Sequence, residues 1–377
     1  MKPIRVWAIA RKESIHIVRD PRSLGMAIAI PMLLLLLFGY ALTLDVDNVP
    51  LIAWDQSGTP ASREFLAYFT GSRYFEVRQF ATDYREIEDA IDRGDALVGL
   101  VVPRDFAEGA KSLTPVRVQA IVDGSDSNTA TIAMGYLDAI SMAYSQDILI
   151  EQTRRVVGKA PGEPIDFRPR VWFNADLESK NYIIPGLIAV IMMVIAALLT
   201  SLTVSKEWEQ GTMEQLISTP VTGPELITGK LLPYFAVGML DVLLAVLMGE
   251  FLFDVPLRGN VLLLFGVSAA FLAGALALGM VISIVAKSQL LASQLAMILT
   301  FLPSFLLSGF MYAIGNMPPP VQVITYLIPA RYFVALLKGI YLKGVDLEVL
   351  GVEAALLVAF AGAMVFLAIS KFRKQLG

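Results

Sequence analysis

Long runs without a charged residue divide this chain, and they have the length of membrane-spanning helices. A hydrocarbon core of about 30 Å takes about 20 apolar residues in helical form. Six segments fit this length, although one of them contains Asp241 and, near its end, Glu250, and another contains Glu353 near its start. The predicted spans are Ser23–Leu44, Asn181–Ser205, Leu231–Phe253, Gly259–Ala286, Gln289–Tyr312 and Val349–Ser370. The pattern therefore predicts an α-helical polytopic membrane protein with six transmembrane helices.

A further apolar stretch follows the fifth span, but proline and basic residues interrupt it. The triplet Pro318–Pro320 breaks it early, and Arg331 lies in the middle of its later part. Irregular backbone at membrane depth is tolerated where protein surrounds it. We therefore predict a re-entrant hairpin over residues 313–343 rather than a seventh crossing.

Basic residues beside the span ends predict the orientation of the chain. Lys and Arg residues concentrate in loops on the cytoplasmic side. The basic residues that precede the first span or follow the last are Lys2, Arg5, Arg11, Lys12, Arg19, Arg22, Lys371, Arg373 and Lys374. Both termini are therefore expected inside, as a lead-in helix over 1–22 and a tail over 371–377. The first span, over 23–44, is interpreted as an uncleaved anchor because its apolar run is too long for a signal peptide.

The same count of spans places residues 45–180 outside the cell and the loop 206–230 inside. The outside segment holds 22 acidic and 14 basic residues, a net charge of −8, whereas the rest of the chain has a net charge of +4. Its apolar pattern predicts strands at Leu51–Trp54, Phe75–Phe80, Ala96–Val102 and Val116–Val122, and helices at Ala61–Phe69, Tyr84–Asp92 and Asn128–Val156. We expect an inserted α/β extracytoplasmic domain between the first two spans, with a linker over Gly158–Arg170.

Composition excludes several kinds of chemistry. The 377 residues are 56% hydrophobic and only 17% charged, which is too apolar for an ordinary soluble chain of this length. There is no cysteine and one histidine, His16, so disulfides, Cys-ligated zinc, iron–sulfur clusters and a thiol nucleophile are excluded. We expect no catalytic residue, no metal site and no nucleic-acid partner.

The inside loop carries the most informative pattern. Over Lys206–Pro220 the spacing predicts a short amphipathic helix at the membrane surface. Met213, Leu216 and Ile217 share one predicted face, and Glu207, Gln210 and Glu214 share another. A charged face on a membrane-embedded element offers a contact for a soluble partner, and the alternative is an ordinary interfacial turn.

The chain resembles the ABC-2-type permeases, in particular the multidrug-efflux branch with a large extracytoplasmic domain. The loop segment from Glu207 to Glu214, with Thr219-Pro220 after it, is similar to the loop after that family's second span. Four further segments match in the same order along the chain: Lys12-Glu13 with Arg19-Asp20-Pro21, Phe38-Gly39-Tyr40, Leu302-Pro303-Ser304 with Ser308-Gly309-Phe310, and Ile328-Pro329-Ala330-Arg331-Tyr332.

The resemblance implies the permease subunit of an exporter in the bacterial inner membrane. It implies two permease chains, identical or sister, on an ABC ATPase present as two copies or a fused pair, with lipid around them and a periplasmic adaptor as a further partner. The sequence has no Gly-x-x-x-x-Gly-Lys-[Ser/Thr] motif, so this chain holds no cofactor, and ATP and Mg²⁺ belong to the ATPase. The residues carried over for ATPase coupling are Glu207, Gly211, Thr212 and Glu214.

Two further sets of candidates concern the transport route. Asp241 lies near mid-depth of its span, where a carboxylate is costly and should face protein or water. It is the candidate for the substrate pathway, and the alternative is a packing contact. The resemblance to re-entrant helices makes Pro329, Arg331 and Tyr332 candidates for a gate.

The expected substrates are drugs or other amphiphiles, and three rival functions stay open. The first is a permease for a lipid or a lipid-linked glycan. The second is a receptor or adhesion protein that the spans only anchor. The third is a proton-driven transporter, which would make Asp241 obligatory.

Overall fold

The computed structural model describes residues 1–42, 46–112, 115–157, 172–174 and 178–372. The chain divides into two compact units. One, the α/β unit, spans Leu44–Pro169, and the other, the helical unit, combines Met1–Thr43 with Arg170–Gly377. The predicted linker over 158–170 and most of the predicted tail over 371–377 lie outside the described residues.

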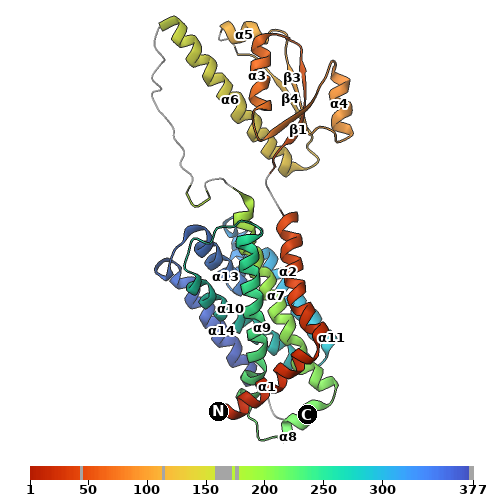
Figure 1. Ribbon diagram of the computed structural model, residues 1–377, viewed down its shortest axis with the longest axis vertical. Helices are drawn as coiled ribbons and strands as arrows, with labels where there is room; N and C mark the ends of the chain where they lie inside the picture. The colour runs from red at the N-terminus through yellow and green to blue at the C-terminus, as the bar shows by residue number, and fades with distance from the viewer. Residues whose placement is uncertain (43–45, 113–114, 158–171, 175–177, 373–377) are drawn as a thin grey trace. The chain divides into compact units, whose positions relative to one another are not determined.

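The helical unit is a bundle with two surface helices, α1 and α8, at one end (Figure 1). In the described residues its elements are α1 (Pro3–Arg19), α2 (Pro21–Ala41), α7 (Ser179–Glu209), α8 (Thr212–Ser218), α9 (Gly223–Phe251), α10 (Val261–Ala286), α11 (Gln289–Leu307), η1 (Ile314–Asn316), α12 (Pro319–Thr325), α13 (Pro329–Lys338), η2 (Gly339–Lys343) and α14 (Leu347–Lys371). Within the described part, six helices are long and apolar enough to cross a membrane: α2, α7, α9, α10, α11 and α14. Each overlaps one predicted span.

α7 is the central helix of this bundle, and most of its side chains are buried. It packs against α2, α9, α10, α11 and α13. Its pairing with α10 includes polar contacts. Thr200 Oγ1 donates to the carbonyl oxygen of Leu276 at 2.7 Å, and the backbone N–H of Ser205 donates to Ser283 Oγ at 2.9 Å. In lipid, the hydrophobic effect does not drive one helix against another. Hydrogen bonds such as these, together with close packing, stabilise the α7–α10 pair.

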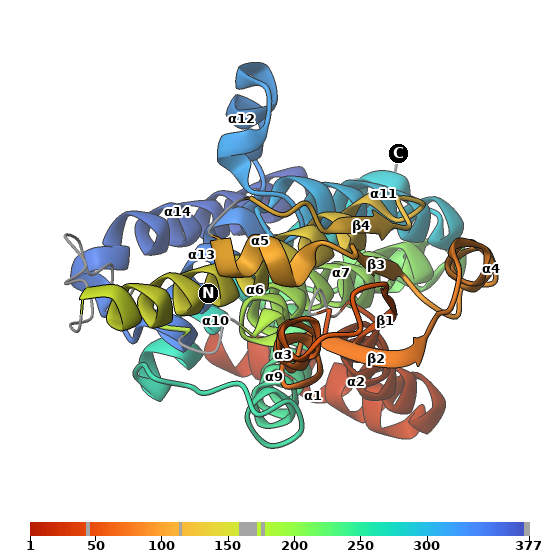
Figure 2. The same cartoon turned by 90° about the horizontal axis from the view of Figure 1, so that it is seen from above.

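The segment after α11 bends sharply instead of crossing straight through. α12 meets the α13–η2 helix at 85°, so the pair is either a broken span or a re-entrant loop. Viewed from above, α12 projects away from the neighbouring helices of its own unit (Figure 2).

The α/β unit is built on a four-stranded sheet of order β2-β1-β3-β4. Its strands are β1 (Val49–Asp55), β2 (Phe75–Phe80), β3 (Val98–Val102) and β4 (Gln119–Val122), and its helices are α3 (Pro60–Thr70), α4 (Tyr84–Asp92), α5 (Phe106–Ser112) and α6 (Ser127–Val157). β1 is parallel to β2 and β3, and β4 is antiparallel to β3. Alternate side chains of β1 enter two different cores: Leu51 packs with α3, α5 and α6, and Ile52 packs with α4.

The elements predicted for this segment are present, with ends shifted by up to three residues. α5 was not predicted, because seven residues with a glycine in the middle give little helical periodicity. In the helical unit, α7 continues to Glu209, so the first residues of the predicted inside loop are its last turn.

Candidate coupling site at the α1 and α8 end of the helical unit

α1 lies across the start of α9 in close contact. Gly229 of α9 leaves room for α1, since a Cβ atom there would come within 2.7 Å of the Ile9 side chain and 3.0 Å of the Val6 carbonyl oxygen. The backbone N–H of Lys2 donates to Glu225 Oε1 at 2.7 Å, and Arg5 lies 3.6 Å from the same carboxylate. The lead-in helix is therefore fastened to the first two turns of α9.

We expect Gly229→Ala to lower the free energy of unfolding by about 1–3 kcal/mol, because α1 would have to move away from α9. The measurement is the thermal unfolding of the detergent-solubilised protein. Gly266→Ala on α10 is the matched control, because a Cβ there meets nothing within 4 Å. Equal stability of the two variants would contradict the close contact.

A buried ion cluster connects α1, α7 and α9. Lys230 Nζ lies 2.8 Å from Glu13 Oε1 and 2.9 Å from Glu207 Oε1. Lys12 Nζ contacts the same two oxygens, at 3.4 Å from Glu13 and 2.9 Å from Glu207. Two ammonium groups and two carboxylate oxygens thus alternate, and the net charge of this ion cluster is zero. Only Lys12 reaches solvent, whereas the Lys230 side chain is 1% exposed.

The two lysines decide the protonation state of Glu13. Burial raises the pKa of the Glu13 carboxyl, but the charges of Lys230 and Lys12 outweigh burial and hold the pKa below its ordinary value. For Lys12, burial alone would lower the pKa of the ammonium group. The neighbouring Glu207 carboxylate has the larger opposite effect, so the pKa of Lys12 is raised above its ordinary value. Glu13 and Lys12 therefore carry opposite charges at neutral pH.

A lowered pKa in the folded state means that ionised Glu13 stabilises the fold. This stability is fully present above the ordinary glutamate pKa of about 4.3. It is lost as the pH falls through the lower pKa of the folded state. We expect Glu13→Gln to be less stable than the parent protein at pH 7, with a difference that shrinks below about pH 4. The thermal unfolding midpoints of the variant and the parent, recorded at several pH values, measure this stability difference. Glu214→Gln on the exposed face of α8 is the control. A difference independent of pH would contradict the assignment.

α8 contacts the bundle through Met213, which is fully buried. Met213 packs in a small apolar cluster formed by residues of six helices. Its buried members are Ile9, Val204, Met213, Leu226, Ile227, Met280 and Ala368. We call the other six of these residues, which surround Met213, the α8 socket. Ile9 also contacts α9 at the Gly229 crossing, and the cluster around Met213 shares the helices α1, α7 and α9 with the ion cluster.

The four residues predicted for ATPase coupling occupy different environments. Glu207 is in the last turns of α7, 8% exposed, and belongs to the ion cluster. Gly211 is exposed and has a φ of 69°, and Thr212 and Glu214 are exposed on α8. The loop surface therefore holds three of the four, while Glu207 contacts α1 and α9 instead. The side chains of Leu216 and Ile217, which complete the predicted apolar face, lie outside the described ones.

Asp241 is fully buried in α9. Neither of its carboxylate oxygens has a hydrogen-bond partner within the described part of the chain. One turn earlier, Gly238 packs against Leu272 of α10. A carboxylate without donors in an apolar bundle is costly when charged. Its burial by protein agrees with what its mid-span position predicts.

The three predicted gate residues gather at the bend between α12 and α13. Pro329 occupies the first turn of α13, where its missing N–H is not needed. The Arg331 guanidinium lies 3.8 Å from the centre of the Tyr326 ring and donates to Thr325 Oγ1. The Tyr332 hydroxyl donates to the Tyr326 carbonyl oxygen at 2.6 Å. Arg331 and Tyr332 thus fix the bend between the two helices.

Sequence reasoning missed Glu13 and Lys230 as parts of one site. Lys230 Nζ contacts carboxylates 217 residues before it and 23 residues before it in the chain. The available signal was that Glu13 in the lead-in helix, Glu207 after the second span and Lys230 before the third were all expected on the cytoplasmic side. A single sequence does not say which of them meet.

Comparisons with known proteins match nearly the whole chain. The model of the ABC-2 family transporter protein matches residues 21–370. The probable multidrug ABC transporter permease YbhS of Escherichia coli is 39% identical over 99% of this chain and 97% of its own length. The probable multidrug ABC transporter permease YbhR of the same organism is 29% identical over 92% of each chain. The ABC transporter permease protein NatB of Bacillus subtilis is 24% identical over 93% of this chain and 95% of its own.

Proposed function

The chain belongs to the ABC-2 transporter family, and from that premise we propose that it is the membrane subunit of an ATP-driven exporter of amphiphilic molecules, drugs among them. It is a multi-pass membrane permease, and members of its family work with an ABC ATPase. The ATPase is a separate chain in this proposal, in agreement with the lack of a phosphate-binding loop in the sequence.

The observation that carries the proposal is the attachment of α8. Among the described side chains of this short helix, Met213 is fully buried, and Thr212 and Glu214 are exposed. In this proposal, a helix that Met213 anchors in the α8 socket passes a push from a soluble partner to the helices that form the socket. The socket and the ion cluster share α1, α7 and α9, so the push reaches three helices at once. We propose that Glu214 and Thr212 meet the ATPase, and that Glu207 transmits the movement from within the ion cluster.

The remaining assembly follows from the same proposal. Two such permease chains, identical or sister, accompany the ATPase, which binds ATP and Mg²⁺. The end with α1 and α8 faces the cytoplasm, in agreement with the excess of basic residues on α1. The bacterial inner membrane is the proposed location, with the α/β unit outside the cytoplasm and a periplasmic adaptor as its candidate partner.

The substrate class is supported by the apolar interior and by the name of YbhS, a probable multidrug permease. Molecules that partition into lipid reach a membrane-embedded route without crossing a polar entrance. Asp241 would then attract the positively charged ones once a conformational change exposes it. Opening of the bend held by Arg331 and Tyr332 is the proposed gating movement at the other end of the route.

Transport into everted membrane vesicles tests the proposal. Vesicles from host cells that overproduce the chain with its partner ATPase should take up a fluorescent amphiphilic dye when ATP is supplied. A protonophore should leave this uptake intact, and Asp241→Asn should reduce it without abolishing it. Uptake that needs a proton gradient and that Asp241→Asn abolishes would favour the proton-driven transporter. Absence of any dye or lipid movement would favour the anchored receptor.

A further inference from the structure

α1 has two exposed features besides the side that packs on α9. The first is an apolar strip: Ile4, Trp7 and Val18 are 76%, 64% and 69% exposed. The second is an excess of positive charge. The one acidic residue of α1, Glu13, is buried in the ion cluster. An interfacial helix that combines apolar and basic faces binds anionic bilayers.

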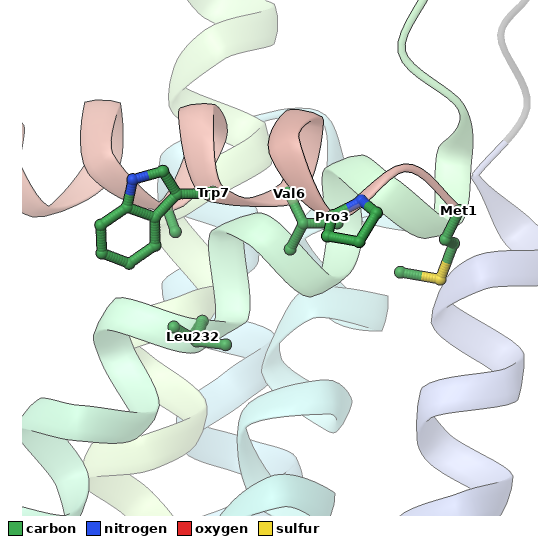
Figure 3. Close-up of a pocket in the computed structure, with 6 residues that line it drawn as sticks. Met1, Pro3, Val6, Trp7 and Leu232 are labelled. Carbon is green, nitrogen blue, oxygen red and sulfur yellow. The ribbon is translucent and has the colours of Figure 1, made fainter.

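A groove lies between this helix and the bundle. Met1, Pro3, Val6, Trp7 and Ala10 line it along α1, and Leu232 of α9 lines the opposite side. Figure 3 shows Leu232 across the gap from Val6 and Trp7, with Pro3 and Met1 further along. No ionisable side chain lines this groove, so it suits a hydrocarbon chain rather than a polar ligand.

Two exposed basic residues are sequence neighbours of residues that line the groove. Lys2 lies between the lining residues Met1 and Pro3, and Arg11 follows the lining residue Ala10. Both are exposed, and neither side chain has a partner in the part of the chain that the structure describes. Two other cations of this helix are occupied, because Arg5 donates to the Pro220 carbonyl oxygen and Lys12 contacts Glu207. A ligand with one negative group and an apolar tail would satisfy both features.

We propose that the groove binds an anionic phospholipid of the cytoplasmic leaflet, with an acyl chain between α1 and Leu232 and the phosphate near Lys2 and Arg11. The lipid joins α1 to α9 beside the Gly229 crossing, and its occupancy stabilises the docked position of α1. Charge complementarity selects the headgroup, since a zwitterionic lipid offers the same tail without net charge. This inference does not depend on the proposed export function.

The test compares two lipids of equal chain length. Purified full-length protein in neutral detergent is titrated with phosphatidylglycerol or phosphatidylcholine, and the thermal unfolding midpoint is followed. We expect phosphatidylglycerol to raise the midpoint with saturation and phosphatidylcholine to raise it less. Native mass spectrometry should detect phosphatidylglycerol retained on the protein. An equal response to the two lipids would overturn the headgroup assignment.

The variant is Lys2→Gln with Arg11→Gln, both on the surface and outside the ion cluster. One basic residue near an anionic surface contributes about a fivefold gain in affinity, so loss of both should weaken phosphatidylglycerol binding by about 30-fold. The matched control, Arg63→Gln with Arg85→Gln, removes two exposed charges from the α/β unit and should bind as the parent does.

Two results separate this site from general attraction. An equal loss in the control would show nonspecific charge attraction and would overturn the proposal. The same would follow if glycerol phosphate, which has the headgroup without a tail, reproduced the stabilisation in full. Unchanged binding by the Lys2 and Arg11 variant would overturn it as well.

Discussion

Lys230→Met is expected to lower the free energy of unfolding by about 3–5 kcal/mol, which is the usual cost of leaving one buried charge of an ion pair without its partner. Lys230 is the fully buried cation of the ion cluster, with both Glu13 and Glu207 within 2.9 Å of its Nζ atom. After its removal, two carboxylates would share Lys12 alone, and Lys12 is half exposed. We expect α1 to separate from α9 as a consequence.

Thermal unfolding in detergent measures this loss, and protease sensitivity of the N-terminal segment reports the release of α1. Lys371→Met removes an exposed cation at the end of α14 and should change stability by less than about 0.5 kcal/mol. The triple variant Lys230→Met, Glu13→Gln and Glu207→Gln should recover most of the loss, because the one charge it leaves in the cluster, on Lys12, reaches solvent. A Lys230→Met protein as stable as the parent, or a triple variant without recovery, would contradict the ion cluster.

Gly211→Pro is expected to abolish the stimulation of the partner ATPase by the permease while the chain still inserts into the membrane. The chain turns from α7 into α8 at Gly211, whose φ is 69°. Proline fixes φ near −65°, so α8 would leave the position in which Met213 enters its socket. Glu207→Ala should also remove stimulation, through the ion cluster. ATP hydrolysis by the assembled complex in lipid measures both.

A milder pair of variants separates coupling from simple strain. Gly211→Ala and Gly58→Ala both force a side chain into a left-handed conformation, and each should cost about 1–2 kcal/mol. Gly58 has a φ of 59° and open space around it, but it lies in the α/β unit. Only Gly211→Ala should lower ATPase stimulation. Equal activity of the two variants would contradict a role for the α7–α8 turn.

The membrane-spanning helices could be predicted because their signal is local. An uncharged run such as Gly259–Ala286 admits few alternatives, and α10 occupies Val261–Ala286. The strands were found for a similar reason, since β-branched runs bounded by turns repeat along the segment. The second span was predicted to end at Ser205 because Lys206 and Glu207 are charged, and the helix α7 continues past that point to Glu209. The structure buries Glu207 among opposite charges, which lets the helix continue.

The candidate site could be predicted only in part, because its contacts join distant segments. Gly211, Thr212 and Glu214 stand in one loop, and one segment of sequence was enough to select them. The partners of Glu207 lie on α1 and α9, and nothing in the sequence pairs Glu13 with Lys230. Arg331 was selected as an obstacle to a straight span, and in the structure it contacts Tyr326 and Thr325 across the bend.

Affinity capture of the solubilised full-length protein from its native membrane, followed by mass spectrometry of the proteins retained, tests the central claim most directly. We predict recovery of an ATPase with a phosphate-binding loop by the parent protein, and its loss with Gly211→Pro, although that variant reaches the membrane in equal amount. Recovery of no such ATPase in several detergents and in a cross-linked sample would contradict the coupling of this permease to ATP hydrolysis.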